Sequence, residues 1–165
     1  MATTIYGAQV VKSPTRETNY ASGIIGKNSE VFAVGDILTI DASHGLKVAG
    51  ATDSIIGISA TAATMTATNE TVALVTPAYV PIDQDTEFFM GCNLALTPLT
   101  SVGAYYSLVA GGTGAQQVDV NAGVRTTTNR VVMCTKVDPY GLGTSDSLKQ
   151  GYFKFVKIFN VKSNT

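Results

Sequence analysis

Short apolar segments with a two-residue period dominate the chain from Val31 onward. This period, together with many β-branched residues, is typical of strands rather than helices. Glycine, asparagine, aspartate and proline separate the segments, as in the turns of antiparallel sheets. We therefore predict an all-β fold, a small β-barrel or β-sandwich of about ten short strands, with candidate strands at 31–34, 37–40, 46–48, 55–59, 71–77, 79–82, 86–92, 104–109, 116–120, 130–137 and 152–161.

The stretch from Ala60 to Asn69 is the one segment whose pattern is compatible with a helix. Several of its residues are threonines, and β-branched side chains lose χ1 freedom in a helix. We expect no stable helix in this stretch.

Residues 1–28 differ from the remainder of the chain. They are polar, contain Pro14, Asn19 and Gly23, and show neither a helical nor a lasting strand period. We interpret them as an extended N-terminal arm that either lies along a neighbouring subunit or is disordered. The β-barrel or β-sandwich domain then spans residues 29–165, and it is expected to stay folded when the arm is removed.

A weak internal repeat runs through this domain. The first copy opens with Val34-Gly35 and passes through a strand, a glycine turn and Lys47-Val48 to the strand 55–59. The second opens with Val102-Gly103, whose glycine lies 68 residues after Gly35, and ends with the strand 131–135. Each copy is predicted to be a hairpin plus a third strand. Such a unit cannot bury both faces alone, so we expect the copies to pack together.

The low charge content favours a protein that is part of a permanent assembly. Charged residues make up 14% of the chain, against roughly 25% in average soluble proteins. A sparsely charged surface suits a permanent assembly, although a small monomer with a threonine-coated exterior would have the same composition. The net charge is −1 with no basic cluster, which argues against nucleic acid as a partner. The late lysines Lys149, Lys154, Lys157 and Lys162 indicate a solvated strand edge.

The lack of a signal-peptide pattern and the apolar surroundings of the cysteines indicate a cytoplasmic site of synthesis. The first residues show no signal-peptide pattern, and no stretch approaches the roughly 18 apolar residues of a membrane helix. We therefore expect no membrane partner. Cys92 and Cys134 lie in apolar surroundings and are expected to be free, buried thiols rather than a disulfide or a zinc site.

Catalytic and cofactor motifs are weak. A nucleophilic triad needs a base, and the only histidine, His44, lies in the turn Ser43-His44-Gly45. The glycine-rich segments 111–114 and 141–143 are not followed by the Lys-Ser/Thr and helix that hold a phosphate, so they indicate loops. We expect no catalytic residue and no cofactor.

The acidic segment 83–87 is the strongest candidate metal site. Asp83, Asp85 and Glu87 alternate along an extended segment, but Ca²⁺ takes six to eight oxygen ligands. A glycosidase would need a carboxylate pair across a cleft, with Tyr105 or Tyr106 for sugar stacking. We expect no metal ligand here and place these tyrosines in a core or an interface.

Aromatic residues supply material for contacts. Phe153, Phe155 and Phe159 alternate onto one face, which is predicted to be core or a docking surface, and Phe88-Phe89-Met90 is similarly apolar.

The run Phe32-Ala33-Val34-Gly35-Asp36-Ile37-Leu38-Thr39-Ile40, a glycine turn and then Asp53-Ser54-Ile55-Ile56-Gly57-Ile58-Ser59 resembles the β-barrel head-decoration (cement) proteins of tailed bacteriophages. These proteins show Gly-Asp before an apolar strand, a turn, a short strand and then an Ile-Gly-apolar strand. The segment 72–82 resembles the strand that follows. The resemblance covers residues 31–82, and the second half only through the internal repeat.

This resemblance implies a structural virion protein on the capsid surface, without enzymatic activity. Its partners would be the major capsid protein and further copies of itself, with a trimer favoured, and the N-terminal arm would contact the capsid. Two alternatives remain at this point. One is another virion surface β-protein, such as a fibre, tail or receptor-binding module, and the other is a hydrolase with an unrecognised site.

Overall fold

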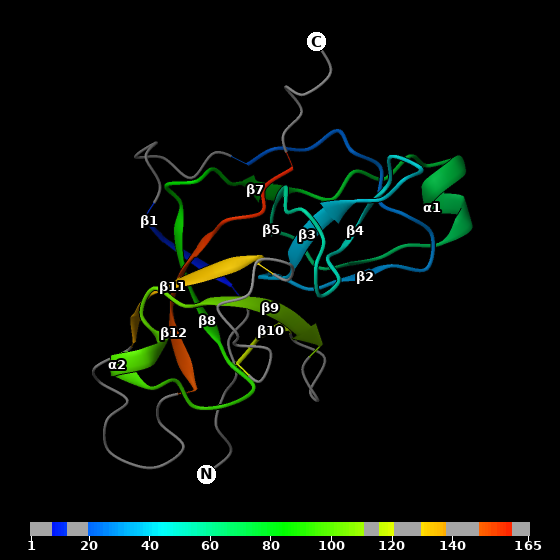
Figure 1. Cartoon of the computed structure of the whole chain (residues 1–165). Helices are drawn as coiled ribbons and strands as arrows, with labels where there is room; N and C mark the ends of the chain where they lie inside the picture. Colours follow the sequence, from blue (N-terminus) through cyan, green and yellow to red (C-terminus); the bar gives the residue numbers. More distant parts are fainter. Residues whose placement is uncertain (1–7, 13–19, 111–115, 121–129, 138–148, 160–165) are drawn as a thin grey trace.

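Strands form nearly all of the regular structure in the computed structural model, which describes residues 8–12, 20–110, 116–120, 130–137 and 149–159 (Figure 1). The all-β fold class is confirmed. In chain order the described elements are β1 (Gln9–Lys12), β2 (Val31–Phe32), β3 (Ile37–Ile40), β4 (Leu46–Val48), β5 (Gly57–Ser59), β6 (Ala63–Thr64), α1 (Ala67–Thr71), β7 (Tyr79–Pro81), β8 (Glu87–Gly91), α2 (Pro98–Ser101), β9 (Tyr105–Ala110), β10 (Gln116–Asp119), β11 (Val132–Val137) and β12 (Gln150–Phe155).

The first half of the chain curls into a small barrel. Its four-stranded sheet has the order β4-β3-β5-β7, and the segment 20–28 joins the two edges. Ala21 and Tyr79 exchange two backbone hydrogen bonds of 2.8 and 3.0 Å, which covers the β7 edge. Lys27 N–H donates to the Leu46 carbonyl at 2.9 Å, which covers the β4 edge. We call this unit the first barrel.

The second half repeats this arrangement on a larger scale. Its sheet has the order β1-β8-β12-β11-β9-β10. Cys92, directly after β8, forms a parallel bridge to Val118 of β10, and Asn93 N–H donates to the Val118 carbonyl at 3.0 Å. These contacts join β8 to β10, so the five strands from β8 to β12 curl into the second barrel. β1 pairs with the beginning of β8.

The two barrels share one hydrogen-bond pattern. Gly35 and Gly103 both have left-handed backbone angles, with φ of 90° and 78°. The N–H of Gly35 donates to Ser59 at 2.9 Å, and the N–H of Gly103 donates to Cys134 at 2.8 Å. In both barrels a hairpin is followed by a third strand that pairs with its first strand: β4-β3-β5 and β10-β9-β11. The weak sequence repeat thus coincides with a repeated topology.

The barrels are joined by a common core. Ile37, Ile55 and Ile58 of the first barrel belong to the same buried cluster as Phe88 and Phe153 of the second. A separate, smaller cluster fills the first barrel itself, with the buried residues Phe32, Leu38, Leu46, Met65 and Tyr79. One barrel therefore completes the packing of the other, as expected for units too small to bury both faces alone.

A buried amide reinforces the junction. Gln116 on β10 is 5% exposed. Its Oε1 accepts from the Ile37 N–H and its Nε2 donates to the Ala49 carbonyl, both at 2.6 Å. These two backbone groups lie in the first barrel, so one side chain satisfies polar groups across the junction.

The predicted strand at 71–77 is wrong, and so is the expectation of no helix before it. The helix α1 begins after Thr66, whose hydroxyl accepts from the Asn69 N–H at 3.2 Å as an N-cap. The Thr71 hydroxyl donates to the Ala67 carbonyl at 2.6 Å. Threonines that disfavour the middle of a long helix can cap and bond a helix of this length.

Two further boundaries differ from the prediction. The last described strand, β12, ends at Phe155 rather than Val161, and residues 160–161 lie outside the described residues. Phe153 and Phe155 are buried, but Phe159 is 38% exposed and does not continue their face. The helix α2 was not predicted; Pro98 in its first turn, where the missing N–H is harmless, is its one sequence signal.

The described parts of residues 1–28 are extended but do not form a separate arm. Gln9–Lys12 is the strand β1, and Ala8 is buried in the common core. The segment 20–28 closes the first barrel, as described above. These two segments pack with the rest of the chain, because their backbone groups pair with the sheet edges of β4, β7 and β8.

Candidate functional site

His44, the only histidine of the chain, lies in a turn that Asp41 holds. Asp41 Oδ1 accepts from the N–H groups of Ser43 at 2.9 Å and Gly45 at 2.8 Å. The Lys27 ammonium also bonds this carboxylate, which lowers the pKa of Asp41 and raises that of Lys27. His44 itself has a left-handed φ of 66° and an exposed side chain.

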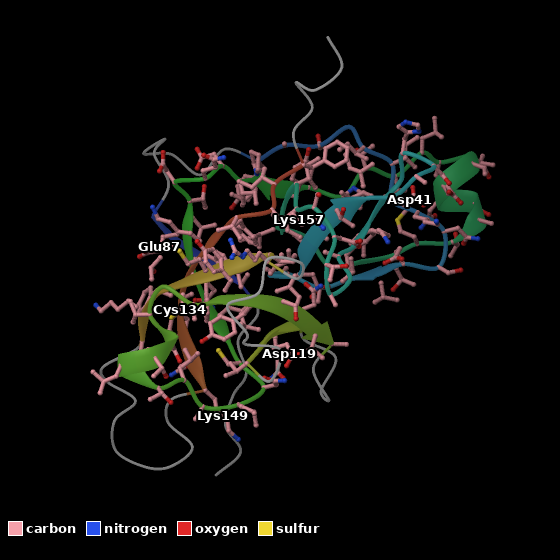
Figure 2. The ribbon with its side chains drawn as sticks, in the orientation of Figure 1. Asp41, Glu87, Asp119, Cys134, Lys149 and Lys157 are labelled. Atoms are coloured by element: carbon pink, nitrogen blue, oxygen red, sulfur yellow. The ribbon has the colours of Figure 1, made fainter. Side chains whose placement is uncertain are left out.

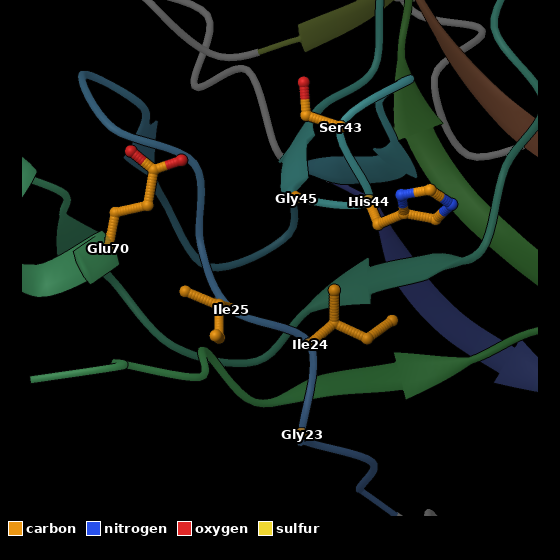
Figure 3. A pocket seen from close by; sticks show the side chains of 7 residues that line it. All are labelled: Gly23, Ile24, Ile25, Ser43, His44, Gly45 and Glu70. Carbon is orange, nitrogen blue, oxygen red and sulfur yellow. The ribbon is translucent and has the colours of Figure 1, made fainter. Parts of the chain in front are cut away.

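A pocket of about 360 Å³ opens beside this turn, on the first barrel. Figure 3 shows Glu70, from α1, and His44 on opposite sides, with Ile24 and Ile25 between them. The imidazole points away from Glu70 in this view. The geometry thus forms no acid–base pair, but it does form a pocket with an apolar wall and one carboxylate on its rim.

The acidic segment 83–87 does not converge on a single point. Asp83 Oδ1 accepts from the Asp85 N–H at 3.0 Å and the Thr86 hydroxyl at 2.8 Å, which makes it a turn residue. Glu87 accepts from the Thr135 hydroxyl at 2.9 Å. In the described part of the chain, no three His, Cys, Asp or Glu side chains gather as metal ligands do.

Cys92 and Cys134 are buried free thiols, as predicted. Burial raises the pKa of Cys134 to about 11, and burial together with the charge of Cys134 raises the pKa of Cys92 further. Because the thiolate is the reactive form, these residues act as small apolar core residues.

The glycine-rich segments 111–114 and 141–143 lie outside the described residues. Near the first of them, a cleft of about 370 Å³ separates the residues 48–51 of the first barrel from 108–110 of the second. Gln116 lines it, but both ends of its amide already bond the backbone. Among the described residues that line it, this cleft offers no unused polar side chain with which to orient a ligand.

The outward side of the six-stranded sheet carries a group of residues that sequence reasoning missed. In one row, Phe89 of β8 lies opposite Gln9 of β1 and Tyr152 of β12, and Tyr152 lies opposite Lys136 of β11. Directly opposed residues share one side of a sheet. We call this side the outer sheet face, with the members Gln9, Glu87, Phe89, Tyr105, Met133, Lys136, Tyr152 and Lys154, together with Arg130, which lies over Tyr105.

Aromatic rings and cations pair across this face. The guanidinium of Arg130 lies 4.3 Å from the centre of the Tyr105 ring. The ammonium of Lys136 lies 5.4 Å from the centre of the Tyr152 ring, and Phe89 packs edge-on to Tyr152 at 5.2 Å. Figure 2 shows the side chains of this sheet around the labelled Glu87. Tyrosine and arginine are enriched where proteins bind one another.

The alternation of apolar and polar residues in the sequence predicts part of the outer sheet face. The alternation that buries Phe153 and Phe155 must turn Tyr152 and Lys154 outward. The pairing of β12 with β8 and β11, which brings Phe89 and Lys136 beside Tyr152, depends on long-range register that the sequence does not reveal.

Large apolar side chains are exposed at two ends of the molecule, marked by α1 and α2 in Figure 1. Val72 and Leu74, directly after α1, are 75% and 53% exposed. Leu99 in α2 is 94% exposed, with Leu94 and Val102 nearby in the chain. Contiguous exposed apolar patches mark surfaces that contact other molecules, whereas single exposed apolar side chains are common on monomers.

A scan against protein-family models and a search of curated proteins both found no match to this chain. No helix in the described part of the chain is long and apolar enough to cross a membrane.

Proposed function

We propose that this chain is a structural virion protein that binds the outer surface of a bacteriophage capsid and stabilises contacts between major-capsid subunits. On this proposal it is not an enzyme, carries no cofactor, and acts as a homo-oligomer. The observation that carries the proposal is a double barrel that presents exposed apolar side chains at the α2 end, above all Leu99.

The α2 end suits adhesion to a large surface. Leu99 lies on a four-residue helix whose first turn contains Pro98, so its backbone is held in a defined geometry. The Ser101 hydroxyl accepts from the Thr97 N–H at 2.8 Å, which fixes the turn further. A backbone held in this way loses little conformational entropy when a partner covers the side chain.

Weak contacts of this kind suffice when they are repeated. An oligomer that touches several capsid subunits binds them with an effective concentration that multiplies the separate affinities. Binding to the assembled shell, and not to its separated subunits, stabilises the shell by mass action. This mechanism requires a surface that is complementary to the capsid and apolar contacts, but no catalysis, in keeping with the sparse charge of the chain.

A second candidate function is another virion surface role, as a fibre, tail or receptor-binding module. The partly exposed rings of Tyr105, Tyr152 and Phe89 favour it, because aromatic faces of this kind also stack on sugars. Binding at a tail tip, or to a host glycan, would support this candidate.

Co-sedimentation with expanded, empty phage heads tests the proposal, and negative-stain images show where the protein binds. We expect regular occupancy of the shell, and about tenfold weaker binding by Leu99→Ala, because the exposed leucine loses its apolar contact. Thr100→Ala, on the same helix, is the matched control and is expected to bind as the parent does. An absence of binding to heads by the parent chain, or equal binding by Leu99→Ala, would contradict the proposal.

A further inference from the structure

Charge is divided unequally between the two barrels. Residues 20–81, which form the first barrel, contain two lysines and five carboxylates, a net charge of −3. Residues 82–165 contain five lysines, two arginines and six carboxylates, a net charge of +1. One half of the molecule is therefore acidic and the other slightly basic, although the whole chain carries only −1.

The acidic half has a pocket that fits a long cationic side chain. The pocket beside α1 has Ile24 and Ile25 in its wall and Glu70 on its rim (Figure 3). Lysine and arginine bury their aliphatic stems on apolar surface and keep the charged end at a polar rim. The exposed Val72 and Leu74 follow Glu70 in the chain.

The backbone at Leu74 supports a role for this surface in contacts. Leu74 has a left-handed φ of 50°, which is unfavourable for a leucine. Such strain persists where the surroundings enforce it and is concentrated at functional positions. Here the strained residue presents a half-exposed apolar side chain, although glycine would hold the same turn without strain.

The slightly basic half supplies the matching surface. Lys136 is exposed on the outer sheet face and lies over the Tyr152 ring. It has no carboxylate partner among the described residues, whereas Lys154 lies 3.9 Å from Asp85. Phe89 and Tyr152 beside it provide the apolar area that would meet the Val72 and Leu74 side chains.

We infer that the occupant of the pocket is a second copy of this chain, whose Lys136 enters it toward Glu70 while its outer sheet face covers Val72 and Leu74. Opposite charge on the two surfaces, and a Lys136 ammonium without a carboxylate partner among the described residues, favour this occupant over an unrelated partner. The inference names the self-contact within the proposed oligomer, but it does not depend on capsid binding.

Such a contact is head to tail when the pocket and the outer sheet face, which lie on different barrels, cannot both meet their counterparts across one two-fold axis. Copies joined in this way close into a ring when the rotation allows, rather than into a two-fold dimer. Either single substitution therefore disrupts every contact of the assembly, because each contact pairs one pocket with one outer sheet face.

Light scattering after size-exclusion chromatography tests the contact with the full chain. We expect the parent to assemble, and Glu70→Lys or Lys136→Glu alone to run as the 17.2 kDa monomer. An equimolar mixture of the two variants is expected to regain assembly, because the native Lys136 of one variant meets the native Glu70 of the other and the two reversed charges meet at the next contact. Both substitutions in one chain should restore the parent assembly, because the charges are exchanged.

Leu74→Gly provides a variant that does not threaten folding. It relieves the left-handed strain and removes the apolar side chain, so we expect weaker self-association with equal or higher thermal stability. Leu99→Ala, at the opposite end of the molecule, is the control and should assemble as the parent does. A monomeric parent, a mixture that stays monomeric, or unchanged assembly of both charge variants would overturn the inference. Loss of head binding with the assembly intact would contradict the capsid role alone.

Discussion

The side chain of Gln116 links the two barrels. Its amide satisfies an N–H at Ile37 and a carbonyl at Ala49, and both belong to the other barrel. Buried backbone groups that lose a partner retain the full cost of their desolvation. The junction between the barrels therefore combines apolar packing with the polar side chain of Gln116.

We expect Gln116→Met to destabilise the fold by about 2–4 kcal/mol, because it leaves two buried backbone groups without partners while it keeps the volume. Urea unfolding followed by circular dichroism measures the change. Gln84→Met, in an exposed turn, is the control and should leave the midpoint unchanged. A midpoint for Gln116→Met equal to that of the parent would show that water replaces the amide.

Asp36 predicts a dependence of stability on pH. Burial raises the pKa of its carboxyl, although the Ala33 N–H donates to it at 2.7 Å. A carboxyl whose pKa is raised by folding binds its proton more tightly in the folded state. The parent therefore loses stability as the pH rises from the ordinary aspartate value of about 3.9 through the folded pKa.

Asp36→Asn, which removes the charge and keeps an acceptor, should raise the melting temperature at neutral pH. The gain should disappear below about pH 4, where Asp36 is protonated in both states. Asp85→Asn, at a carboxyl that is largely exposed, is the comparison. A lower melting temperature for Asp36→Asn at neutral pH would mean that the charged bond to Ala33 outweighs the cost of burial.

At the scale of elements, the open edge of the large sheet belongs to β1. This strand covers the beginning of β8, while Cys92 and Asn93, directly after β8, meet β10. Without β1, the Glu87–Phe89 edge of β8 would expose unpaired backbone groups, and such edges recruit other strands. β1 is thus part of the fold, although its sequence belongs to the stretch that we interpreted as an arm.

Deletion of residues 1–12 should destabilise the protein by about 2–4 kcal/mol and promote aggregation, because β8 loses its partner and the core loses Ala8. Thermal unfolding with static light scattering measures both effects. Deletion of residues 1–7, which spares Ala8 and β1, is the control. A parent-like melting temperature after the longer deletion would restore the interpretation of this segment as a detachable arm.

At the scale of the whole molecule, the common core makes the two barrels one cooperative unit. Ile58 of the first barrel and Phe153 of the second lie in the same buried cluster. Neither barrel can open without exposing apolar surface of the other. Unfolding should therefore be a single two-state transition despite the internal repeat.

Calorimetry tests this expectation through the agreement of the calorimetric and van't Hoff enthalpies. Ile58→Ala and Phe153→Ala, at about 2–5 kcal/mol each, should shift the same single transition from opposite barrels. Two separated transitions, each sensitive to only one of the substitutions, would show that the barrels fold independently.

The sequence by itself determined the all-β class, most strand positions and the buried thiols. Each of these follows from local alternation and local turn chemistry, which a strand of a few residues already displays. The short helices escaped notice because their signals, the cap at Thr66 and the proline at 98, occupy single positions rather than a period.

Only the tertiary structure decided which residues act together. Long-range register placed Lys136 over Tyr152, closed each barrel with a segment distant in sequence, and aimed Gln116 at the opposite barrel. It also placed Glu70 on the rim of a pocket with His44 on the far side. These pairings depend on the summed packing of many strands, and a periodic pattern specifies which side chains point inward but not which strand lies next to which.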